Sequence, residues 1–123
     1  MRSKENFLDY IPRHNILFPF QENEEGLVEV QIENKGVWNR ILQHFANKPR
    51  YTYITLEGMG SFIWKNIDGV RTVYEIGQMV KDEYGKDAEP LYERLCPYIQ
   101  KLHQMRFIVY ENKMKKKSDI LKA

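Results

Sequence analysis

The middle of the chain carries two helical patterns of apolar residues separated by a stop signal. The first pattern places four apolar residues on one helix face: Met59, Phe62, Ile63 and Ile67. Asp68-Gly69 is expected to end this helix, because glycine adopts the left-handed conformation with little strain. Thr72 and Glu75 have the spacing of a capping box, and a second apolar face follows at Val73, Ile76, Val80 and Tyr84. Two short helices joined by a tight turn predict a helix-turn-helix core, with Phe62 and Trp64 as buried anchors.

Strand patterns lie on both sides of these helices. Residues 16–20 are expected as a strand at an edge or bulge, since Pro19 lacks an N–H group. Residues 27–33 alternate apolar and polar side chains, the period of a half-buried strand, and the turn at 22–26 makes a hairpin of the two. Residues 51–55 are dense in β-branched and aromatic side chains and predict a third strand. Residues 107–110 predict a last one.

Two further helices complete the prediction. Residues 34–48 have the spacing of a short amphipathic helix inserted before the third strand. Residues 87–90 are expected to start a helix with Pro90 at its first position, where a missing amide costs nothing. Its apolar face is Leu91, Leu95, Tyr98, Ile99 and Leu102. Pro97 lies within this helix and is expected to kink it or divide it in two.

The order of elements predicts an α+β fold, with a small antiparallel sheet followed by three helices. We expect an N-terminal arm at residues 1–14, one domain at 15–112 and a disordered lysine-rich tail at 113–123. The single cysteine excludes an internal disulfide framework, and the chain shows neither a signal peptide nor a membrane span. A cytoplasmic protein is therefore expected. The net charge of +2 is too small to indicate nucleic acid or an anionic membrane as a partner.

No constellation of catalytic residues can be assembled from the sequence. His14, His44 and His103 lack the spacing of a zinc site. Cys96 is expected to be a packed thiol rather than a nucleophile. Gly58 and Gly60 lack the third glycine of a dinucleotide-binding loop. We therefore expect a protein that is not an enzyme and that has no metal, no cofactor and no catalytic residues.

Three segments carry recognisable motifs: Leu56 with Gly60-Ser61-Phe62-Ile63-Trp64, then residues 68–76 with the pattern D-G-x-x-T-V-x-E-I, and residues 89–95. Together they resemble the PqqD family, small proteins with a winged-helix-like fold that are also known as RiPP recognition elements. The resemblance extends from about Ile16 to Ile108. The inserted segment 35–49, the N-terminal arm and the lysine tail depart from the shortest members of the family.

The resemblance implies a non-catalytic adaptor that binds the leader segment of a precursor peptide. The peptide would add a strand to the third β-strand, and a partner enzyme, often a radical SAM enzyme, would modify it. Carried over by position, the site comprises Tyr51, Thr52, Tyr53, Ile54 and Thr55 on the strand and Leu91, Arg94, Leu95 and Tyr98 on the third helix. An exposed strand edge offers unpaired amides and carbonyls, which is compatible with this mode of binding. Which of these side chains face the groove is left open.

Two other functions compete with the adaptor. A winged-helix regulator would need basic and amide side chains on its recognition helix, but the second helix also carries Glu75, Asp82 and Glu83, which repel phosphate. An orphan interaction or dimerisation module is the other alternative. The sequence leaves the oligomeric state open, a homodimer included.

Overall fold

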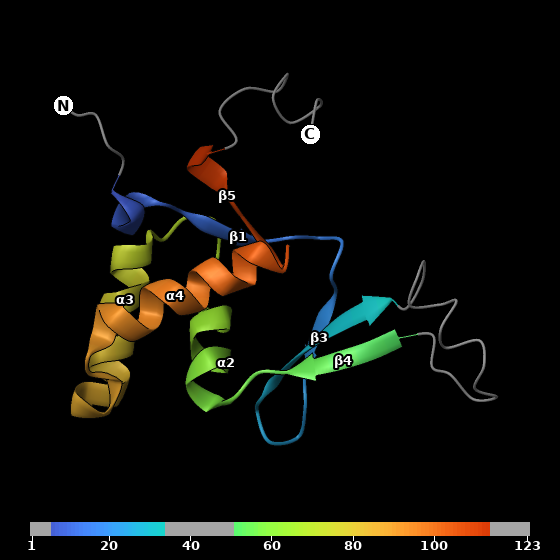
Figure 1. The fold of residues 1–123 in the computed structure, drawn as a ribbon. Helices are drawn as coiled ribbons and strands as arrows, with labels where there is room; N and C mark the ends of the chain where they lie inside the picture. Colours follow the sequence, from blue (N-terminus) through green and yellow to red (C-terminus); the bar gives the residue numbers. More distant parts are fainter. Residues whose placement is uncertain (1–5, 34–50, 114–123) are drawn as a thin grey trace. The chain divides into compact units, whose positions relative to one another are not determined.

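The protein divides into two compact units. We call residues 16–61 the sheet unit, and residues 1–15 together with 62–123 the helical unit. The computed structural model describes residues 6–33 and 51–113, and Figure 1 colours them along the sequence.

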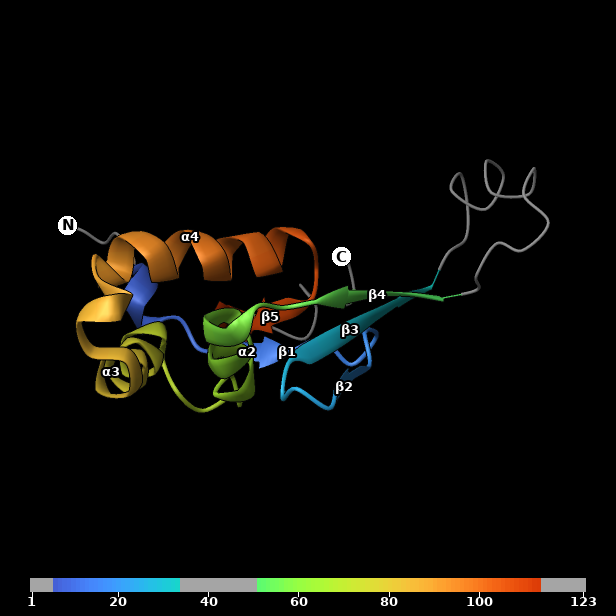
Figure 2. The same ribbon diagram turned by 90° about the horizontal axis from the view of Figure 1, so that it is seen from below.

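The sheet unit contains three antiparallel strands in the order β2-β3-β4 (Figure 2). Their bounds are Phe20–Glu22 for β2, Val28–Glu33 for β3 and Tyr51–Thr55 for β4. Between β2 and β3 the Asn23 side chain accepts hydrogen bonds from the amides of Glu25 and Leu27. Gly26 completes this turn with a φ of 82°, a conformation that favours glycine. The predicted hairpin and third strand are thus confirmed.

The first predicted strand is wrong in its position. Ile16 and Leu17 form a turn and are 86% and 77% exposed, and β2 begins only at Phe20. Pro19 has no N–H group to donate to a ladder, so the regular pairing begins after it. Its carbonyl still accepts from the Gln31 amide at 2.8 Å.

Three α-helices follow the sheet. Helix α2 (Gly58–Lys65) begins in the sheet unit and continues into the helical unit, which also contains α3 (Val73–Tyr84) and α4 (Leu91–Gln104). A 3-10 turn, η2 (Gly85–Ala88), lies between α3 and α4. Large apolar side chains buried in the helical unit form its core: Trp64, Ile67, Val73, Ile76, Val80, Leu95, Ile99, Leu102, Phe107 and Ile108.

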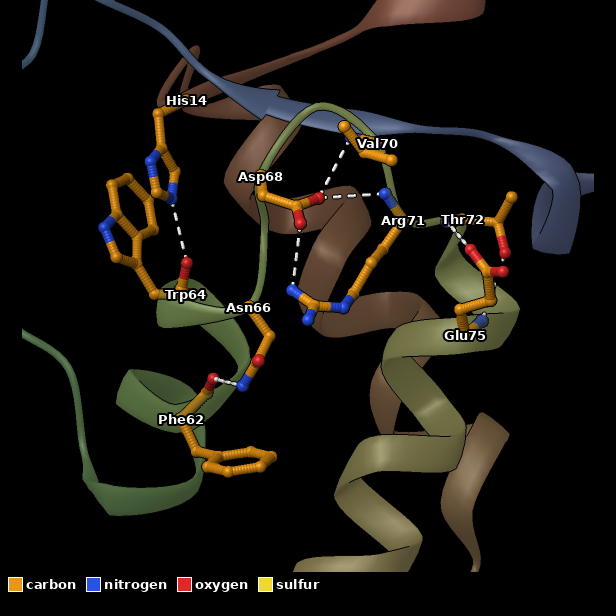
Figure 3. A network of polar contacts seen from close by, with 9 residues as sticks. All are labelled: His14, Phe62, Trp64, Asn66, Asp68, Val70, Arg71, Thr72 and Glu75. Carbon is orange, nitrogen blue, oxygen red and sulfur yellow. Dashed lines mark hydrogen bonds and ion pairs between the residues drawn. The ribbon is translucent and has the colours of Figure 1, made fainter.

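The connection between α2 and α3 is held by side-chain hydrogen bonds (Figure 3). The Asp68 carboxylate accepts from the amides of Val70 and Arg71 and from the Arg71 guanidinium. The capping box is confirmed: the Glu75 amide donates to the Thr72 hydroxyl, and the Thr72 amide donates to the Glu75 carboxylate. Gly69, with a φ of 79°, donates its amide to the carbonyl of Pro12.

Helix α2 ends earlier than the sequence predicts. Its last residue is Lys65, and the amides of Asn66 and Ile67 donate to carbonyls only three residues back. This tighter 3-10 pattern commonly finishes a helix. Asp68-Gly69 therefore forms the following turn and does not cap α2.

The helical unit contains a second sheet. The sequence predicted one of its strands, at residues 107–110, but not the pairing with residues of the arm. Strand β1 (Pro12–His14) pairs antiparallel with β5 (Ile108–Tyr110), and short 3-10 turns lie beside them, η1 (Phe7–Asp9) and η3 (Glu111–Lys113). The Asn112 side chain accepts from the Ile11 amide and donates to the Asp9 carbonyl. The predicted last strand is confirmed, and its partner comes from the predicted arm.

The structure corrects two predictions, the full burial of Phe62 and the division of α4 at Pro97. Trp64 is fully buried, as expected, but Phe62 is only half-buried and contacts the Tyr84 ring edge-on at 5.6 Å. Helix α4 runs unbroken through Pro97, so the predicted division into two helices is wrong, while the kink stays a prediction. Proline removes one backbone hydrogen bond, while buried residues on either side, Leu95 and Ile99 among them, hold both halves against the core.

The α+β class is confirmed: residues 6–33 and 51–113 form small antiparallel sheets and three α-helices. The predicted helix at 34–48 and residues 114–123 of the predicted tail lie outside the described residues. The domain boundaries at 14/15 and 112/113 remain predictions.

Candidate functional site

Strand β4 lies at an edge of the three-stranded sheet. It pairs with β3 from Glu29–Thr55 to Glu33–Tyr51, and no strand within residues 6–33 and 51–113 pairs with its other side. All its residues are exposed except Ile54, which is half-buried. This is the strand that the resemblance assigns to peptide binding.

The register defines which β4 amides point away from β3. In an antiparallel ladder, residue pairs that exchange N–H···O bonds alternate with pairs that do not. The Leu56 amide donates to the Val28 carbonyl at 2.8 Å, which makes Leu56 and Val28 a hydrogen-bonding pair. By alternation, the backbone groups of Thr52 and Ile54 point toward β3. Those of the three remaining residues point to the open edge: Tyr51, Tyr53 and Thr55.

The β2 side of β3 gives an independent check on this assignment. The Gln31 amide donates toward β2, to the Pro19 carbonyl at 2.8 Å. Gln31 pairs with Tyr53, so the backbone of Tyr53 cannot exchange bonds with it and must face outward.

The side chains of β4 divide between the two faces of the sheet. Tyr51 and Tyr53 share one face, and they are 38% and 46% exposed. The Tyr53 hydroxyl donates to the Gln31 side-chain carbonyl at 3.0 Å, which holds the ring against the sheet. Thr52 and Ile54 share the other face with Ile32 and Val30, and Val30 is fully buried.

Ser61 closes the end of the β3–β4 ladder. The Val28 amide donates to the Ser61 hydroxyl at 2.8 Å, and that hydroxyl donates to the Leu56 carbonyl at 2.9 Å. One side chain of α2 thus replaces a direct backbone bond between the two strands. Ser61 is 2% exposed, so no solvent can take its place. The sequence motif contained Ser61, but nothing local to the motif indicated this role.

The predicted α4 residues lie in the helical unit and differ in accessibility. Leu91 and Leu95 are buried in the core. Arg94 is exposed, and its guanidinium donates to the Asp87 carbonyl at 2.7 Å. Tyr98 is half-buried. Of the predicted α4 residues, Arg94 and Tyr98 are therefore the ones whose side chains a partner could contact.

A separate groove of about 780 Å³ lies in the helical unit, between α4, β5 and the N-terminal segment. It is lined by Phe7, Tyr10, Gln100, His103, Gln104, Val109 and Tyr110. The rings of Tyr10 and Tyr110 are 4.9 Å apart, and those of His103 and Tyr110 are 4.4 Å apart. Burial raises the pKa of Tyr110 to about 12, so its hydroxyl stays protonated at neutral pH. No sequence pattern indicated this groove.

Among the described residues, His14 and His103 contact aromatic rings and Cys96 is half-buried, whereas His44 lies outside the described residues. The His14 ring stacks on Trp64 with 4.3 Å between ring centroids, and its Nε2 lies 2.9 Å from the Trp64 carbonyl (Figure 3). Burial lowers the pKa of His14 and of His103. Burial raises the pKa of the Cys96 thiol, which disfavours the reactive thiolate.

The part of the chain that the structure describes also lacks a metal-binding cluster. Within residues 6–33 and 51–113, no group of three or more His, Cys, Asp or Glu side chains could hold a metal ion. None of the described helices combines the length and the apolar character needed to cross a membrane.

These features define a small α+β protein with an aromatic sheet edge that no strand among the described residues covers. The family model for coenzyme PQQ synthesis protein D (PqqD) matches residues 37–108 of the 123. The chain therefore belongs to the PqqD family, and the resemblance read from its motifs is confirmed. No curated protein and no solved structure matches the chain.

Proposed function

We propose that this PqqD-family protein is a non-catalytic adaptor that binds the leader segment of a precursor peptide and presents it to a modifying enzyme. The observation that carries the proposal is the open edge of β4, where the backbone of Tyr51, Tyr53 and Thr55 points away from β3. The family's association with PQQ synthesis supports a protein partner. A radical SAM enzyme is the partner class that the family resemblance suggests.

Strand addition suits this edge on energetic grounds. An incoming peptide would pair its main chain with the outward amides and carbonyls, which supplies affinity independent of side chains. Side chains of alternate residues then supply selectivity. Because β4 already pairs with β3 on its other side, the protein need not rearrange to accept the peptide.

The part that α4 plays in binding remains a prediction. Its assignment to a second wall of the site comes from the family resemblance, and Arg94 offers the most exposed side chain of that set. If the leader is acidic, Arg94→Glu is expected to weaken the complex by charge reversal.

The decisive experiment removes one outward amide and leaves the ladder intact. Tyr53→Pro takes away an N–H that points to the open edge, a position where strands tolerate proline. We expect this variant to keep its fold and to lose binding to the precursor peptide encoded beside its gene. Isothermal titration measures the affinity, and hydrogen exchange of residues 51–55 reports where the peptide binds.

Two control variants separate the backbone effect from other causes. Tyr53→Ala removes the ring but keeps the amide, so it should bind more tightly than Tyr53→Pro. Thr52→Pro removes an amide that points to β3, so it should destabilise the hairpin itself. The proposal fails if the peptide binds while exchange of the Tyr51, Tyr53 and Thr55 amides is unchanged.

A further inference from the structure

One face of the sheet unit combines exposed tyrosine rings with carboxylates. Residues paired directly across an antiparallel ladder share a face, so Tyr51 and Tyr53 lie on the same side as their partners Glu33 and Gln31. Glu29, which pairs with Thr55, lies on this side as well. We call this side the outer face.

The described part of the sheet unit carries charge of one sign. Residues 16–33 and 51–61 contain six glutamates and no aspartate, lysine or arginine. The unit's lysines and arginines are at 35, 40, 48 and 50, all within the segment 34–50 that the structure does not describe. On the outer face of β3, the charged residues are Glu29 and Glu33, and both are negative.

Glu29 is held as an anion in the middle of the outer face. Its carboxylate accepts from the side-chain amide of Gln21 at 2.8 Å and from the side-chain amide of Asn23 at 3.1 Å. These hydrogen bonds lower the pKa of Glu29, so the carboxylate is charged at neutral pH.

An added strand would bring alternate side chains into reach of these groups. Side chains directly opposite Tyr51 and Tyr53 would lie about 5 Å away between Cβ atoms. The row of Glu29 and Glu33 on β3 is two strand spacings away, about 10 Å. A lysine or arginine is long enough to lie across a tyrosine ring, where it gains a cation–π contact, with its charge directed toward β3.

On the opposite face of the sheet, apolar side chains of the peptide would fit best. Thr52 and Ile54 lie there beside Ile32 and Val30, and Val30 is completely buried. Peptide residues that alternate with the cationic ones would extend this apolar surface. This alternation holds for either direction of the added strand, because side chains alternate in both.

We infer that the peptide class accepted by β4 is an extended segment in which lysine or arginine alternates with apolar residues, the cations lying on the outer face. The inference rests on the proposed function, since the main-chain edge binds the peptide and the tyrosines and carboxylates select its sequence.

The test uses synthetic peptides about ten residues long with three alternations: Lys-Val, Ser-Val and Glu-Val. Each is titrated into the isotopically labelled full chain, and the amide signals of Tyr51, Tyr53 and Thr55 are followed by NMR. The Lys-Val peptide should bind at this edge about tenfold or more tightly than the Glu-Val peptide, with Ser-Val between them. Added salt should reduce the affinity for the Lys-Val peptide and the difference between its affinity and that of the Glu-Val peptide.

Variants assign the preference to the outer face. The double variant Glu29→Gln with Glu33→Gln should reduce the preference for Lys-Val over Glu-Val. The matched control, Glu24→Gln with Glu25→Gln, makes the same change of net charge in the hairpin turn and should preserve most of it. Tyr53→Leu should also lower the Lys-Val affinity, because an aliphatic side chain offers no ring to a cation.

The possible results test the cationic selectivity separately from the proposed binding by strand addition. If Ser-Val or Glu-Val binds the β4 edge as tightly as Lys-Val, the cationic selectivity is wrong while strand addition stands. If no peptide shifts the amide signals of Tyr51, Tyr53 and Thr55, the inference is overturned. If Tyr53→Pro also binds the precursor peptide as tightly as the wild type, strand addition itself is overturned.

Discussion

At the scale of single residues, the buried Ser61 and the half-buried His14 connect segments that are distant in the sequence. The Ser61 hydroxyl connects the backbones of Val28 and Leu56, and the His14 imidazole donates to the Trp64 carbonyl. Removal of the Ser61 hydroxyl would deprive a buried backbone donor and a backbone acceptor of this bond.

Ser61→Ala is predicted to destabilise the fold by about 1–3 kcal/mol, since it leaves the Val28 amide and the Leu56 carbonyl unpaired in a dry environment. Urea unfolding followed by circular dichroism measures the loss. Thr55→Ala, at an exposed position, is the control and should change stability by less than about 0.5 kcal/mol. Equal effects of the two substitutions would refute the bridging role.

Stability should decrease as the pH falls through and below about 6.5, the ordinary pKa of histidine. Burial holds the pKa of His14 below its usual 6.5 in the folded protein, so the unfolded chain binds the proton first. The stabilising contribution is complete above pH 6.5 and is lost progressively on acidification. His103 shifts in the same direction. Urea midpoints across this range should vary less in His14→Gln than in the wild type, and an unchanged slope would exclude His14 as the cause.

At the scale of elements, α3 and α4 approach closely at Gly77. A Cβ atom at this position would lie 2.6 Å from the Tyr92 ring. That ring is held by a hydrogen bond from Gln78 at 3.0 Å and by stacking on Tyr74. The glycine therefore serves the packing of two helices, although alanine is the better helix former.

Gly77→Ala is predicted to destabilise the protein by about 1–3 kcal/mol, because overpacking against Tyr92 outweighs the gain in helix propensity. Combining it with Tyr92→Ala should remove the clash, so the double variant should lose less than the sum of the two single changes. Thermal denaturation of all four proteins completes the cycle. Strict additivity would mean that the ring moves aside freely.

At the scale of the whole molecule, the charge distribution argues against nucleic acid as the partner. The net charge of the chain is only +2. In the described part of the sheet unit, glutamates are the only charged side chains. Lysines concentrate at positions 113–117, outside the family match. A partner recognised by the family domain would therefore not need to be an anion.

Duplex DNA is predicted to bind weakly and without sequence preference. Any affinity should come from the lysines at 113, 115, 116 and 117 and should disappear with salt, since it would depend on counterion release. Fluorescence anisotropy at low and physiological salt, with and without residues 113–123, measures this. Tight, sequence-dependent binding by the truncated chain would instead favour a DNA-binding regulator.

Local sequence determined several elements without help from the fold. The capping box at Thr72 and Glu75 formed as predicted, because its two hydrogen bonds join residues three apart. The strand at residues 51–55 has the predicted bounds, since β-branched and aromatic side chains favour extended backbone. The motifs at residues 56–64, 68–76 and 89–95 also indicated the family, which the family model confirms.

Tertiary structure decided what depends on residues far apart in the chain. The pairing of β1 with β5 joins Pro12 to Tyr110, and no local pattern specifies a partner so distant. Pattern placed Tyr53 and Thr52 on opposite faces, but only the register with β3 could tell which amide points outward. Ser61 acquired its bridging role in the same way. The sequence thus determined most of the described helices and strands and the family that they form, because those signals are local. The edge position of β4 among the described strands is instead a property of pairing between strands.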